Sequence, residues 1–366
     1  MNSVPFVHRL RLVVRGVFAL ALGGAAHGAS RPDLDAAAKR WFGGRPGGAA
    51  VAYVDADGVT FAAAGQFAPG DPRSITPDTT FEIGSVSKLF VALLLAESEK
   101  AGKVNRDDPA AKYLLPPGDP DAAKLSKITL VSLATHSAGL PRMASNFRSS
   151  DGNRTGFTRA QLMAGFRRDG ATAVVGGKSV YSNFGVVLLG QALASAWGGG
   201  YPQVLQQQVL DPLGLEHTWL GLIGAKAPVD FPPALVKGAR VPHWEFDALA
   251  PSGALRSTAR DMGKFLQACL GQRETKVNAS IRECTKPLRL MGDGPGKIGL
   301  NWMSTAGPQR PIYWHNGATA GFRAFVAFEP VAGVGVAVLT NTDTGAAPEA
   351  LGFELMGRTN RSAPKK

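Results

Sequence analysis

Apolar residues at the two ends of the chain follow the patterns of β-strands. Two apolar runs within 47–65 flank the polar turn Asp-Ala-Asp-Gly at 55–58, a pattern that predicts a β-hairpin. The runs 321–329 and 333–341 are also strand-like and are separated by a turn that contains proline and glycine. We therefore expect strands near both termini.

The long middle of the chain has the spacing of helices instead. Five helices are predicted there, at 130–135, 158–168, 184–197, 201–210 and 258–270. Thr258, followed three residues later by Asp261, has the pattern of a capping box at the start of the last helix. Strands at both ends with helices between them indicate an α/β (α+β) protein, with a helix-flanked sheet built from both termini and an inserted all-helical lobe.

The segments outside this pattern set the expected domain boundaries. Residues 1–29 combine arginines, a short apolar run and small residues near Gly28-Ala29, as a secretory signal peptide does. We expect cleavage there and an exported protein, periplasmic or secreted, without a stable membrane span. The folded domain should then occupy 30–356, with the helical lobe at roughly 105–285 and a flexible tail at 357–366.

A further predicted helix, which begins near Lys88, has a charged residue where the usual rules for helices disfavour one. Lys88 is followed by eight apolar residues, 89–96, and a helix that is apolar on every face is a buried one. A lysine in the first turn also opposes the helix dipole, whose positive end lies there. Local rules that are broken without a structural gain tend to mark functional sites, so Lys88 is a candidate functional residue.

The net charge of the chain limits the classes of partner that it is expected to bind. The 366 residues carry a formal net charge of +12, which becomes +9 once the three arginines at positions 9, 11 and 15 are removed. Such a surplus favours anionic partners such as lipid head groups or cell-wall polymers. Export and the lack of a nucleic-acid-binding motif argue against nucleic acid. We interpret the basic region 142–168 as a solvated face.

Cysteine and histidine patterns give no sign of a metal. Cys269 and Cys284 lie 15 residues apart and could pair in an oxidising compartment or remain structural thiols, and the sequence leaves both possibilities open. The six histidines form no H-E-x-x-H motif, and the cysteines lack ligand spacing. We therefore expect no metal and no cofactor, and we expect the protein to be a monomer.

Ser85 and Lys88 have the spacing of a catalytic pair. On a helix, residues i and i+3 share a face, so the hydroxyl and the amine can meet. A serine becomes nucleophilic when a base takes its proton, and burial lowers a lysine's pKa so that it can be that base. The helix start also supplies backbone N–H groups for a developing oxyanion. The alternative is structural, with Ser85 as a helix cap and Lys88 as a surface lysine.

Two downstream motifs favour the catalytic interpretation. Tyr181 and Asn183 precede the apolar helix 184–197, where a tyrosine can pass protons and an amide can hold a substrate carbonyl. The triplet His-Asn-Gly at 315–317 precedes the terminal strands, where a glycine lets a substrate backbone approach closely. The structural alternatives are an asparagine cap beside a packed tyrosine, and a turn with an incidental histidine.

A rival nucleophile motif lies at 135–139. The sequence Thr-His-Ser-Ala-Gly is similar to the G-x-S-x-G elbow of α/β-hydrolases. Its first glycine is missing, however, and no alternating series of strands and helices surrounds it. Ser85 is therefore the better candidate.

With these motifs in place, the chain resembles the penicillin-recognising serine hydrolases, whose nucleophile motif is S-x-x-K. It is most similar to class C β-lactamases and to their relatives, the D-Ala-D-Ala carboxypeptidases, D-aminopeptidases and β-lactamase-like esterases. FEIGSVSK at 81–88 is the most specific likeness, and DPLGLEHTW at 211–219 and APSGALRSTARDM at 250–262 follow in the expected order. The resemblance spans roughly residues 35–355 and implies a β-lactamase/transpeptidase-like fold with an antiparallel sheet.

Carried over residue by residue, the resemblance implies a complete site. Ser85 would be the acylated nucleophile, and Lys88 its base partner. Tyr181 would pass a proton to the leaving nitrogen and activate the hydrolytic water. The backbone N–H groups of Ser85 and Ala318 would form the oxyanion hole. Substrate binding would fall to Asn183, which would hold the side-chain amide, and to His315, Asn316, Gly317 and Thr319.

Three departures from the class C pattern concern the substrate carboxylate. His315 stands where class C enzymes have the lysine of Lys-Thr-Gly, and an imidazole is mostly neutral near pH 7. Histidine there is typical of the D-Ala-D-Ala peptidase and aminopeptidase branch. Arg142-Met143 replaces a glutamine, and the segment 342–344 lacks an expected Asn-Arg pair. The carboxylate would then be bound by Asn316, Thr319, Arg310 or Arg323.

Three functions follow from this resemblance. The first expectation is a class C-like serine β-lactamase of the cephalosporinase type, which opens the β-lactam amide through an acyl-Ser85 intermediate. The second is a D-alanyl-D-alanine carboxypeptidase or endopeptidase, or an esterase with the same machinery. The third is a β-lactam-binding sensor that is acylated without turnover, against which Tyr181 argues as a water activator. The expected partner is thus a small-molecule β-lactam or a D-Ala-D-Ala peptide.

Overall fold

A computed structural model describes residues 33–148, 156–305, 310–343, 345 and 347–357. These residues belong to the unit Asp33–Lys366. The predicted signal peptide at 1–29 lies outside the described residues, as does the predicted tail beyond Gly357.

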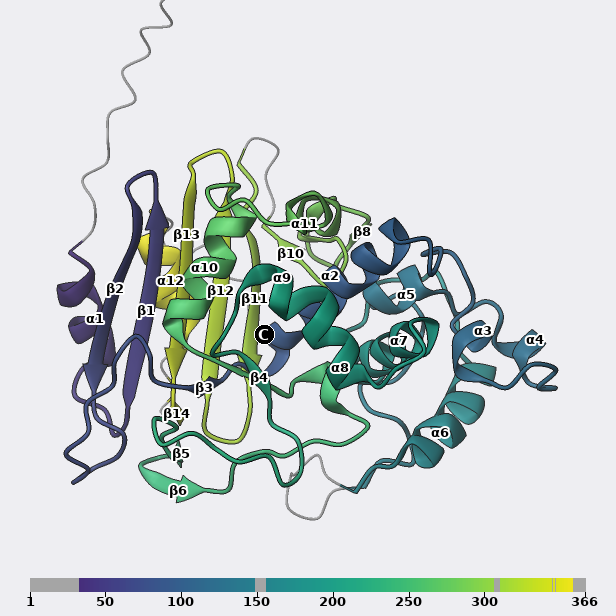
Figure 1. Cartoon of the computed structure of the whole chain (residues 1–366), viewed down its shortest axis with the longest axis horizontal. Coiled ribbons are helices and arrows are strands. Elements are labelled where there is room, and N and C mark those ends of the chain that lie inside the picture. The colour runs from purple at the N-terminus through teal and green to yellow at the C-terminus, as the bar shows by residue number, and fades with distance from the viewer. Residues whose placement is uncertain (1–32, 149–155, 306–309, 344, 346, 358–366) are drawn as a thin grey trace, which may run out of the picture. The chain divides into compact units, whose positions relative to one another are not determined.

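The predicted terminal strands meet in one sheet (Figure 1). β1 (Gly48–Asp55) and β2 (Gly58–Gly65) pair as the predicted hairpin. β12 (Arg323–Glu329) and β13 (Val334–Thr340) pair with each other, and β13 also pairs with β1. The sheet is therefore built from both ends of the chain, as the sequence predicts.

Four further strands extend this sheet beyond β12. The strand order is β2-β1-β13-β12-β11-β10-β9-β8, and every neighbouring pair is antiparallel. The added strands are β11 (Tyr313–Ala318), β10 (Met303–Ser304), β9 (Lys297–Ile298) and β8 (Arg289–Leu290). The last three span two residues each, which is too short for a periodic pattern.

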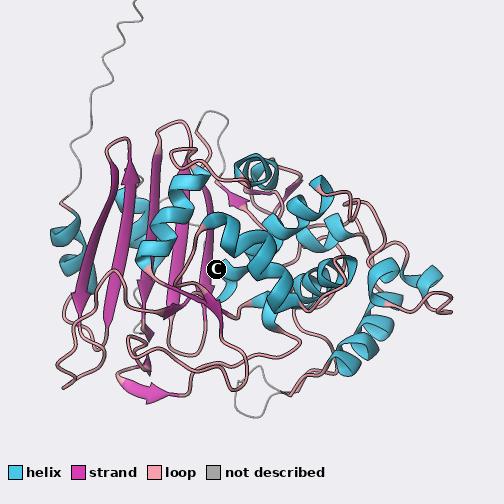
Figure 2. Ribbon diagram, in the orientation of Figure 1, coloured by secondary structure: helices cyan, strands magenta, loops and turns pink. Residues whose placement is uncertain are grey.

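Helices cover both faces of the sheet (Figure 2). In β1, Val51 and Tyr53 face the core that holds α1 (Leu34–Phe42) and α12 (Pro348–Leu355). The alternate residues face the larger core, in which α10 (Ala259–Cys269) packs on β1 and β13. Since both faces are buried, the central strands are almost continuously apolar.

The helical part of the chain surrounds one buried helix pair. α2 (Ser87–Lys100) packs against α7 (Asn183–Ala196), and both are apolar over nearly their whole surface. The predicted helices are all present, within a few residues of their expected ends. The remaining helices of this part are α3 (Ala111–Leu114), α4 (Ala122–Leu125), α5 (Leu130–Ala134), α6 (Arg159–Ala171), α8 (Tyr201–Leu205) with a π-helical turn Gln206–Leu210, α9 (Asp211–Leu213) and α11 (Asn278–Thr285).

The inserted lobe at 105–285 contains short strands as well as helices. They form two small sheets, ordered β3-β7-β4 and β14-β5-β6. The strands that lie within 105–285 are β4 (Trp219–Leu220), β5 (Ala234–Val236), β6 (Ala239–Val241) and β7 (Leu255–Ser257). They pair with β3 (Phe81–Glu82) and β14 (Thr342–Asp343), which lie outside that range. The prediction of an all-helical lobe missed them because strands of two or three residues leave no alternation to detect.

The predicted capping box at the start of α10 is half formed. Thr258 Oγ1 accepts a hydrogen bond from the Asp261 backbone N–H, at 3.1 Å. The Asp261 carboxylate does not return to the cap, because it accepts from the His217 N–H (2.8 Å) and from Thr218 Oγ1 (2.9 Å). Asp261 thus ties α10 to the segment before β4.

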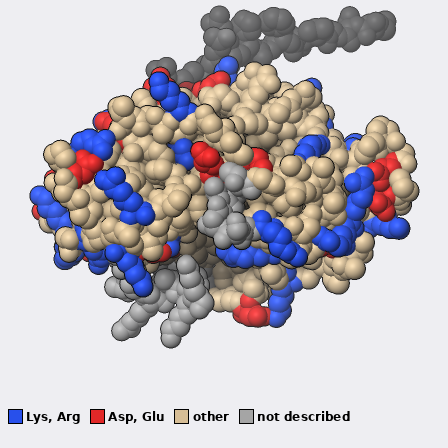
Figure 3. Space-filling model, turned by 90° about the horizontal axis from the view of Figure 1, so that it is seen from below, with Lys and Arg blue, Asp and Glu red and all other residues tan. Residues whose placement is uncertain are grey.

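Four observations concern the cysteines, the surface charge, membrane spans and metal sites. Cys269 and Cys284 are free, buried thiols whose pKa burial raises. On the face drawn in Figure 3, the Lys and Arg side chains lie in several groups interleaved with acidic ones. Within the described ranges, no helix is long and apolar enough to cross a membrane, and no group of three His, Cys, Asp or Glu residues could hold a metal ion.

Candidate active site

Ser85 lies in a tight turn between a strand and a helix. The 3₁₀ turn Gly84–Val86 leads directly into α2, and neither element has a side-chain cap. Ser85 is therefore not a helix cap. Gly84 has a φ of +49°, and a Cβ there would lie 2.7 Å from the backbone N of Ala318. The glycine thus lets the Ser85 turn lie directly against β11.

Lys88 is a fully buried amine beside the serine. Its side chain is 0% exposed, which rules out a surface lysine. Lys88 Nζ donates to Ser85 Oγ at 2.9 Å and to the backbone carbonyl of Ser252. The i, i+3 spacing therefore brings the hydroxyl and the amine together on one face, as the sequence predicts.

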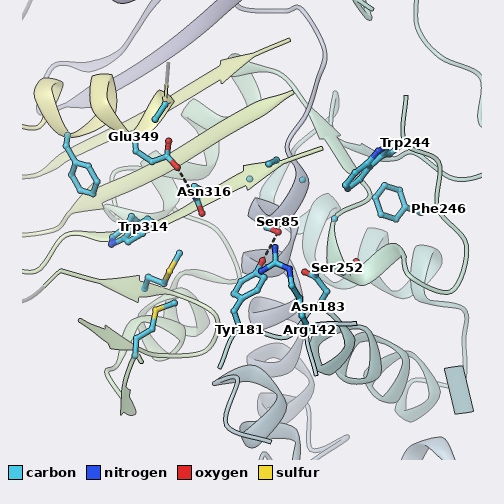
Figure 4. Close-up of a pocket in the computed structure, with 18 residues that line it drawn as sticks. Ser85, Arg142, Tyr181, Asn183, Trp244, Phe246, Ser252, Trp314, Asn316 and Glu349 are labelled. Atoms are coloured by element: carbon cyan, nitrogen blue, oxygen red, sulfur yellow. Dashed lines mark hydrogen bonds between the residues drawn. The ribbon is translucent and has the colours of Figure 1, made fainter. Parts of the chain in front are cut away.

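Tyr181 provides the second contact to the nucleophile. Its hydroxyl donates to Ser85 Oγ at 2.7 Å (Figure 4). Burial raises the pKa of Tyr181 to about 12, so the phenol keeps its proton at neutral pH. The predicted asparagine-cap alternative is wrong, because Ser182 is the N-cap of α7 and accepts from the Gly185 N–H at 2.9 Å.

Cations and imidazoles surround the Tyr181 ring. Lys88 Nζ lies 5.1 Å from the ring centre, and the Arg142 guanidinium carbon lies 5.2 Å from it. The rings of His136 and His315 have their centres 4.7 and 6.3 Å from that of Tyr181. Positive charge over an aromatic face is attractive, so Lys88 and Arg142 help to hold the tyrosine in place, while the two imidazoles pack against its ring.

His315 lies behind the site rather than in the substrate pocket. It is 1% exposed, and its Nδ1 lies 2.6 Å from the Asn316 carbonyl oxygen. Burial, together with the nearby Lys88 charge, lowers the pKa of His315 to about 3. His315 is therefore neutral at pH 7 and does not line the pocket, in contrast to its predicted role in substrate binding.

The buried His315 predicts a pH dependence of stability. Its ordinary pKa of 6.5 in the unfolded chain falls to about 3 on folding, so only the unfolded chain takes up this proton between those values. The free energy of unfolding should fall as the pH falls from 6.5 towards 3, by up to about 1.4 kcal/mol per pH unit for this group. Urea unfolding across that range should show a shallower slope for His315→Gln than for the wild type.

The exposed His217 offers a matched control for this measurement. His217→Gln controls for the removal of a histidine side chain as such. Equal slopes for the wild type and His315→Gln would contradict the assignment of a depressed pKa to His315.

The end of β11 forms the wall opposite Tyr181. Asn316, Gly317 and Ala318 line the pocket. A Cβ on Gly317 would lie 1.9 Å from the Ile83 carbonyl oxygen and 3.1 Å from the Ser85 backbone N. Since both glycines permit this close contact, the backbone segments that carry the Ser85 and Ala318 N–H groups lie directly against each other.

We expect Gly317→Ala to separate these two backbone segments. The added methyl group must push β11 away from the Ser85 turn, which should lower the free energy of unfolding by about 1–3 kcal/mol, as overpacking does. Acylation of Ser85 should slow as well. Gly294→Ala is the control, because a Cβ there meets no atom within 4 Å. Urea unfolding and acylation rates that are equal in both variants would contradict the expected separation.

The Ser85 turn, Tyr181 and the end of β11 border a cavity of about 610 Å³. Its polar lining residues include Ser85, Tyr181, Asn183 and Ser252 (Figure 4). Asn183 Oδ1 is buried without a hydrogen-bond partner among the described residues, so it can accept from a substrate N–H. The large apolar side chains of the lining are Trp244, Phe246, Met291, Met303, Trp314 and Phe353.

Several predicted carboxylate-binding residues lie elsewhere. Thr319 is buried outside the pocket, and its carbonyl oxygen accepts from Arg323 Nη1 at 2.8 Å. Arg323 forms an ion pair with Asp343, and Arg310 Nε lies 3.1 Å from Glu329 Oε1. Of the predicted candidates, Asn316 alone lines the pocket.

The rival serine is not a nucleophile. Ser137 is 1% exposed, and its hydroxyl lies 2.9 Å from Thr135 Oγ1. It does not line the pocket. The preceding His136 instead contributes its ring to the packing around Tyr181.

The structure also adds pocket residues that sequence reasoning missed. Glu349, in the first turn of α12, lines the pocket and accepts a hydrogen bond from Asn316 Nδ2 (Figure 4). Proline followed by glutamate at 348–349 is a helix-start signal that could have placed α12, though not against β11.

Trp244 is held at the opposite end of the pocket by two buried charges. Its backbone N–H donates to Glu82 Oε1 at 3.2 Å, and its carbonyl accepts from Arg256 Nη2 at 2.9 Å. Glu82 and Arg256 lie 3.6 Å apart and are both buried. A long loop with no periodic signal carries Trp244, so the sequence alone did not indicate it.

Known proteins with similar sequences include a peptidase and a β-lactamase. A 28% identical relative from Escherichia coli (strain K12), the D-alanyl-D-alanine-carboxypeptidase/endopeptidase AmpH, aligns over 82% of this chain and 80% of its own length. A Beta-lactamase from Pseudomonas fluorescens is 27% identical, over 74% of this chain and 81% of its own.

Solved structures agree in fold. The class C beta lactamase from Rhodobacter sphaeroides superposes with a TM-score of 0.73 at 23% identity, over 88% of this chain and 98% of that one. D-alanine Carboxypeptidase AmpC from Burkholderia cenocepacia gives 0.72 at 23% identity, over 88% and 96%. A sequence model of the Beta-lactamase family matches residues 35–360. The chain therefore belongs to the beta-lactamase family and is a serine hydrolase that acts on amide bonds.

Proposed function

We propose that this protein hydrolyses amide bonds through an acyl-enzyme on Ser85, and that D-alanyl peptides are its preferred substrates. The observation that carries the proposal is the pair of hydrogen bonds that Ser85 Oγ accepts from Lys88 Nζ (2.9 Å) and Tyr181 Oη (2.7 Å). A hydroxyl held between an amine and a phenol, at the wall of a cavity, has its proton acceptor and its proton donor within reach.

The raised pKa of Tyr181 indicates which residue is the proton acceptor and which is the proton donor. Because Tyr181 keeps its proton at neutral pH, the base that takes the Ser85 proton during attack is the Lys88 amine, acting in its unprotonated form. The new Ser85 Oγ–C bond leaves a negative oxygen, which the backbone N–H groups of Ser85 and Ala318 stabilise. Tyr181 then gives its proton to the leaving nitrogen as the C–N bond breaks, and Lys88 returns a proton to Tyr181.

Hydrolysis of the ester repeats this sequence with water in place of serine. Water attacks the ester carbon, and its proton passes through the Tyr181–Lys88 pair as the bond to Ser85 Oγ breaks. Ser85 recovers its proton, which restores the resting site. Asn183 would hold the acyl group, because its buried Oδ1 can accept from the amide N–H on that side of the scissile bond.

The charge of the pocket favours D-alanyl peptides whose leaving group carries no carboxylate over β-lactams. A β-lactam carries a carboxylate beside its ring nitrogen, which the resemblance places near Asn316. The histidine of the third motif is neutral and outside the pocket there, and Arg323 is paired with Asp343. The E. coli relative is itself named as a peptidase that acts on D-alanyl-D-alanine.

Turnover of β-lactams, including a class C cephalosporinase activity, is the second candidate. The Tyr181 hydroxyl at 2.7 Å from Ser85 Oγ is placed to relay a proton from an attacking water towards Lys88, which favours hydrolysis over a dead-end sensor. The Pseudomonas fluorescens relative is named as a Beta-lactamase. We also propose export, on the signal-peptide pattern of residues 1–29.

Side-by-side kinetics distinguish the two candidates. The purified protein would be given a chromogenic cephalosporin and an N-acyl-D-alanyl peptide series, with Ser85→Ala as the blank. Release of the amine from the peptides, with slow ring opening of the cephalosporin, is the expected result. Fast cephalosporin turnover without release of an amine from any peptide would identify a β-lactamase instead.

A further inference from the structure

The two ends of the pocket differ in charge. Arg142 lies over the Tyr181 ring, beside the Asn183 end that would hold the acyl group. Glu349 lies at the other end, against Asn316 (Figure 4). Arg142 and Glu349 are the charged residues among the described residues that line the pocket.

We propose that Glu349 determines which leaving groups the enzyme accepts, by rejecting an anion and favouring a neutral or cationic group beside the scissile nitrogen. This inference rests on the proposed function, which places the acyl group near Asn183 and the leaving group near Asn316. The preferred bond would then join D-alanine to an amine whose carboxyl group is amidated or absent, or which carries an ammonium group.

The position of Glu349 supports a direct contact with the leaving group. Its side chain is half-buried on the pocket wall, and it stands in the first turn of α12, where the helix dipole stabilises a negative charge. Asn316 Nδ2 donates to its Oε1. This bond also orients the Asn316 carboxamide, so the two side chains act as one polar surface.

No compensating cation faces this surface among the described pocket residues. Arg142, the one Lys or Arg that lines the cavity there, lies with Tyr181 instead. The neighbouring imidazole of His315 is buried behind Tyr181. A carboxylate on the leaving group would therefore meet a like charge, which is unfavourable at short range in a partly desolvated cavity.

A matched substrate series tests this inference. One N-acyl-D-alanyl donor would be joined to D-alanine, to D-alaninamide and to ethylenediamine, which present an anion, a neutral group and a cation beside the same bond. The wild type should show kcat/KM values in the order cation, neutral, anion. Glu349→Gln keeps the acceptor for Asn316 but removes the charge, and should reduce the cation-to-anion ratio about tenfold or more, because hydrogen bonds to charged groups are among the stronger ones.

A second acidic residue on the same helix gives the control. Glu354 is exposed and pairs with Arg40 on α1, away from the pocket. Glu354→Gln should keep the wild-type ratio. A purely structural role of Glu349 would lower kcat/KM for all three substrates equally, and an unchanged ratio in Glu349→Gln would therefore overturn the proposal.

Two penicillins test the same inference if the enzyme cleaves none of the peptides. Acylation by benzylpenicillin and by its methyl ester would be followed by intact mass, since the two differ by one negative charge. The wild type should react faster with the ester, and Glu349→Gln should react with benzylpenicillin about tenfold faster than the wild type does. Equal effects on both compounds would overturn the role of Glu349. Acylation by neither compound would instead refute the proposed function.

Discussion

Replacement of Ser85 by alanine should lower kcat/KM on every substrate of this enzyme by about 10⁴-fold or more, since the covalent route is lost while the pocket remains. The Ser85 hydroxyl is the atom on which Lys88 and Tyr181 converge. Removing it takes away both the nucleophile and the acceptor of the two hydrogen bonds. Amine release and cephalosporin ring opening, measured with equal amounts of folded protein, would show the loss.

Ser87 is the matched control for that substitution. It stands in the same SVSK motif and is buried, but its Oγ accepts from the Leu255 N–H at 3.1 Å rather than facing the pocket. Ser87→Ala should cost some stability, about 1 kcal/mol for one hydrogen bond, and should retain hydrolysis. Comparable hydrolysis by Ser85→Ala and Ser87→Ala would contradict the assignment of the nucleophile.

Tyr181→Phe should have the second largest effect, a loss of about 10²–10⁴ in kcat/KM, which is the usual contribution of general acid–base catalysis. Phenylalanine keeps the ring between His136 and His315 but removes the proton donor to the leaving nitrogen. Hydrolysis of the ester intermediate should also slow, because the phenol no longer relays a proton from the attacking water. A penicillin acyl-enzyme should therefore persist longer in this variant, as intact mass after rapid mixing would show.

Tyr201 controls for the loss of a buried phenol. Its hydroxyl is buried without a hydrogen-bond partner among the described residues, and it lies on α8 outside the pocket. Tyr201→Phe should leave turnover unchanged. If Tyr181→Phe also turns over at the wild-type rate, Lys88 must supply the proton to the leaving group without the phenol.

The nucleophile motif was predictable from sequence because its parts are local. Ser85 and Lys88 are three residues apart on one helix, so their contact follows from helix geometry. The apolar run after Lys88 predicts burial, and the side chain is 0% exposed. The hairpin at 47–65 and the strands at 321–341 were predictable for the same reason, since their patterns are continuous in the sequence.

The contacts between distant segments were not predictable in the same way. Glu349 reaches Asn316 only because α12 packs on the β12 and β13 end of the sheet and turns its first residues towards β11. His315 has the sequence position of a substrate-binding residue, but strand alternation turns it inward behind Tyr181, whereas Asn316 faces the pocket. A one-residue alternation of this kind depends on the register of β11 with β12.

Covalent labelling of Ser85 tests the central claim most directly. The purified protein would be mixed with benzylpenicillin, quenched in acid, and analysed by intact mass and peptide mapping. The account predicts a mass increase of one penicillin, located on the peptide that contains Ser85 and absent from Ser85→Ala. A label on another residue, or a label that persists in Ser85→Ala, would contradict the acyl-enzyme mechanism.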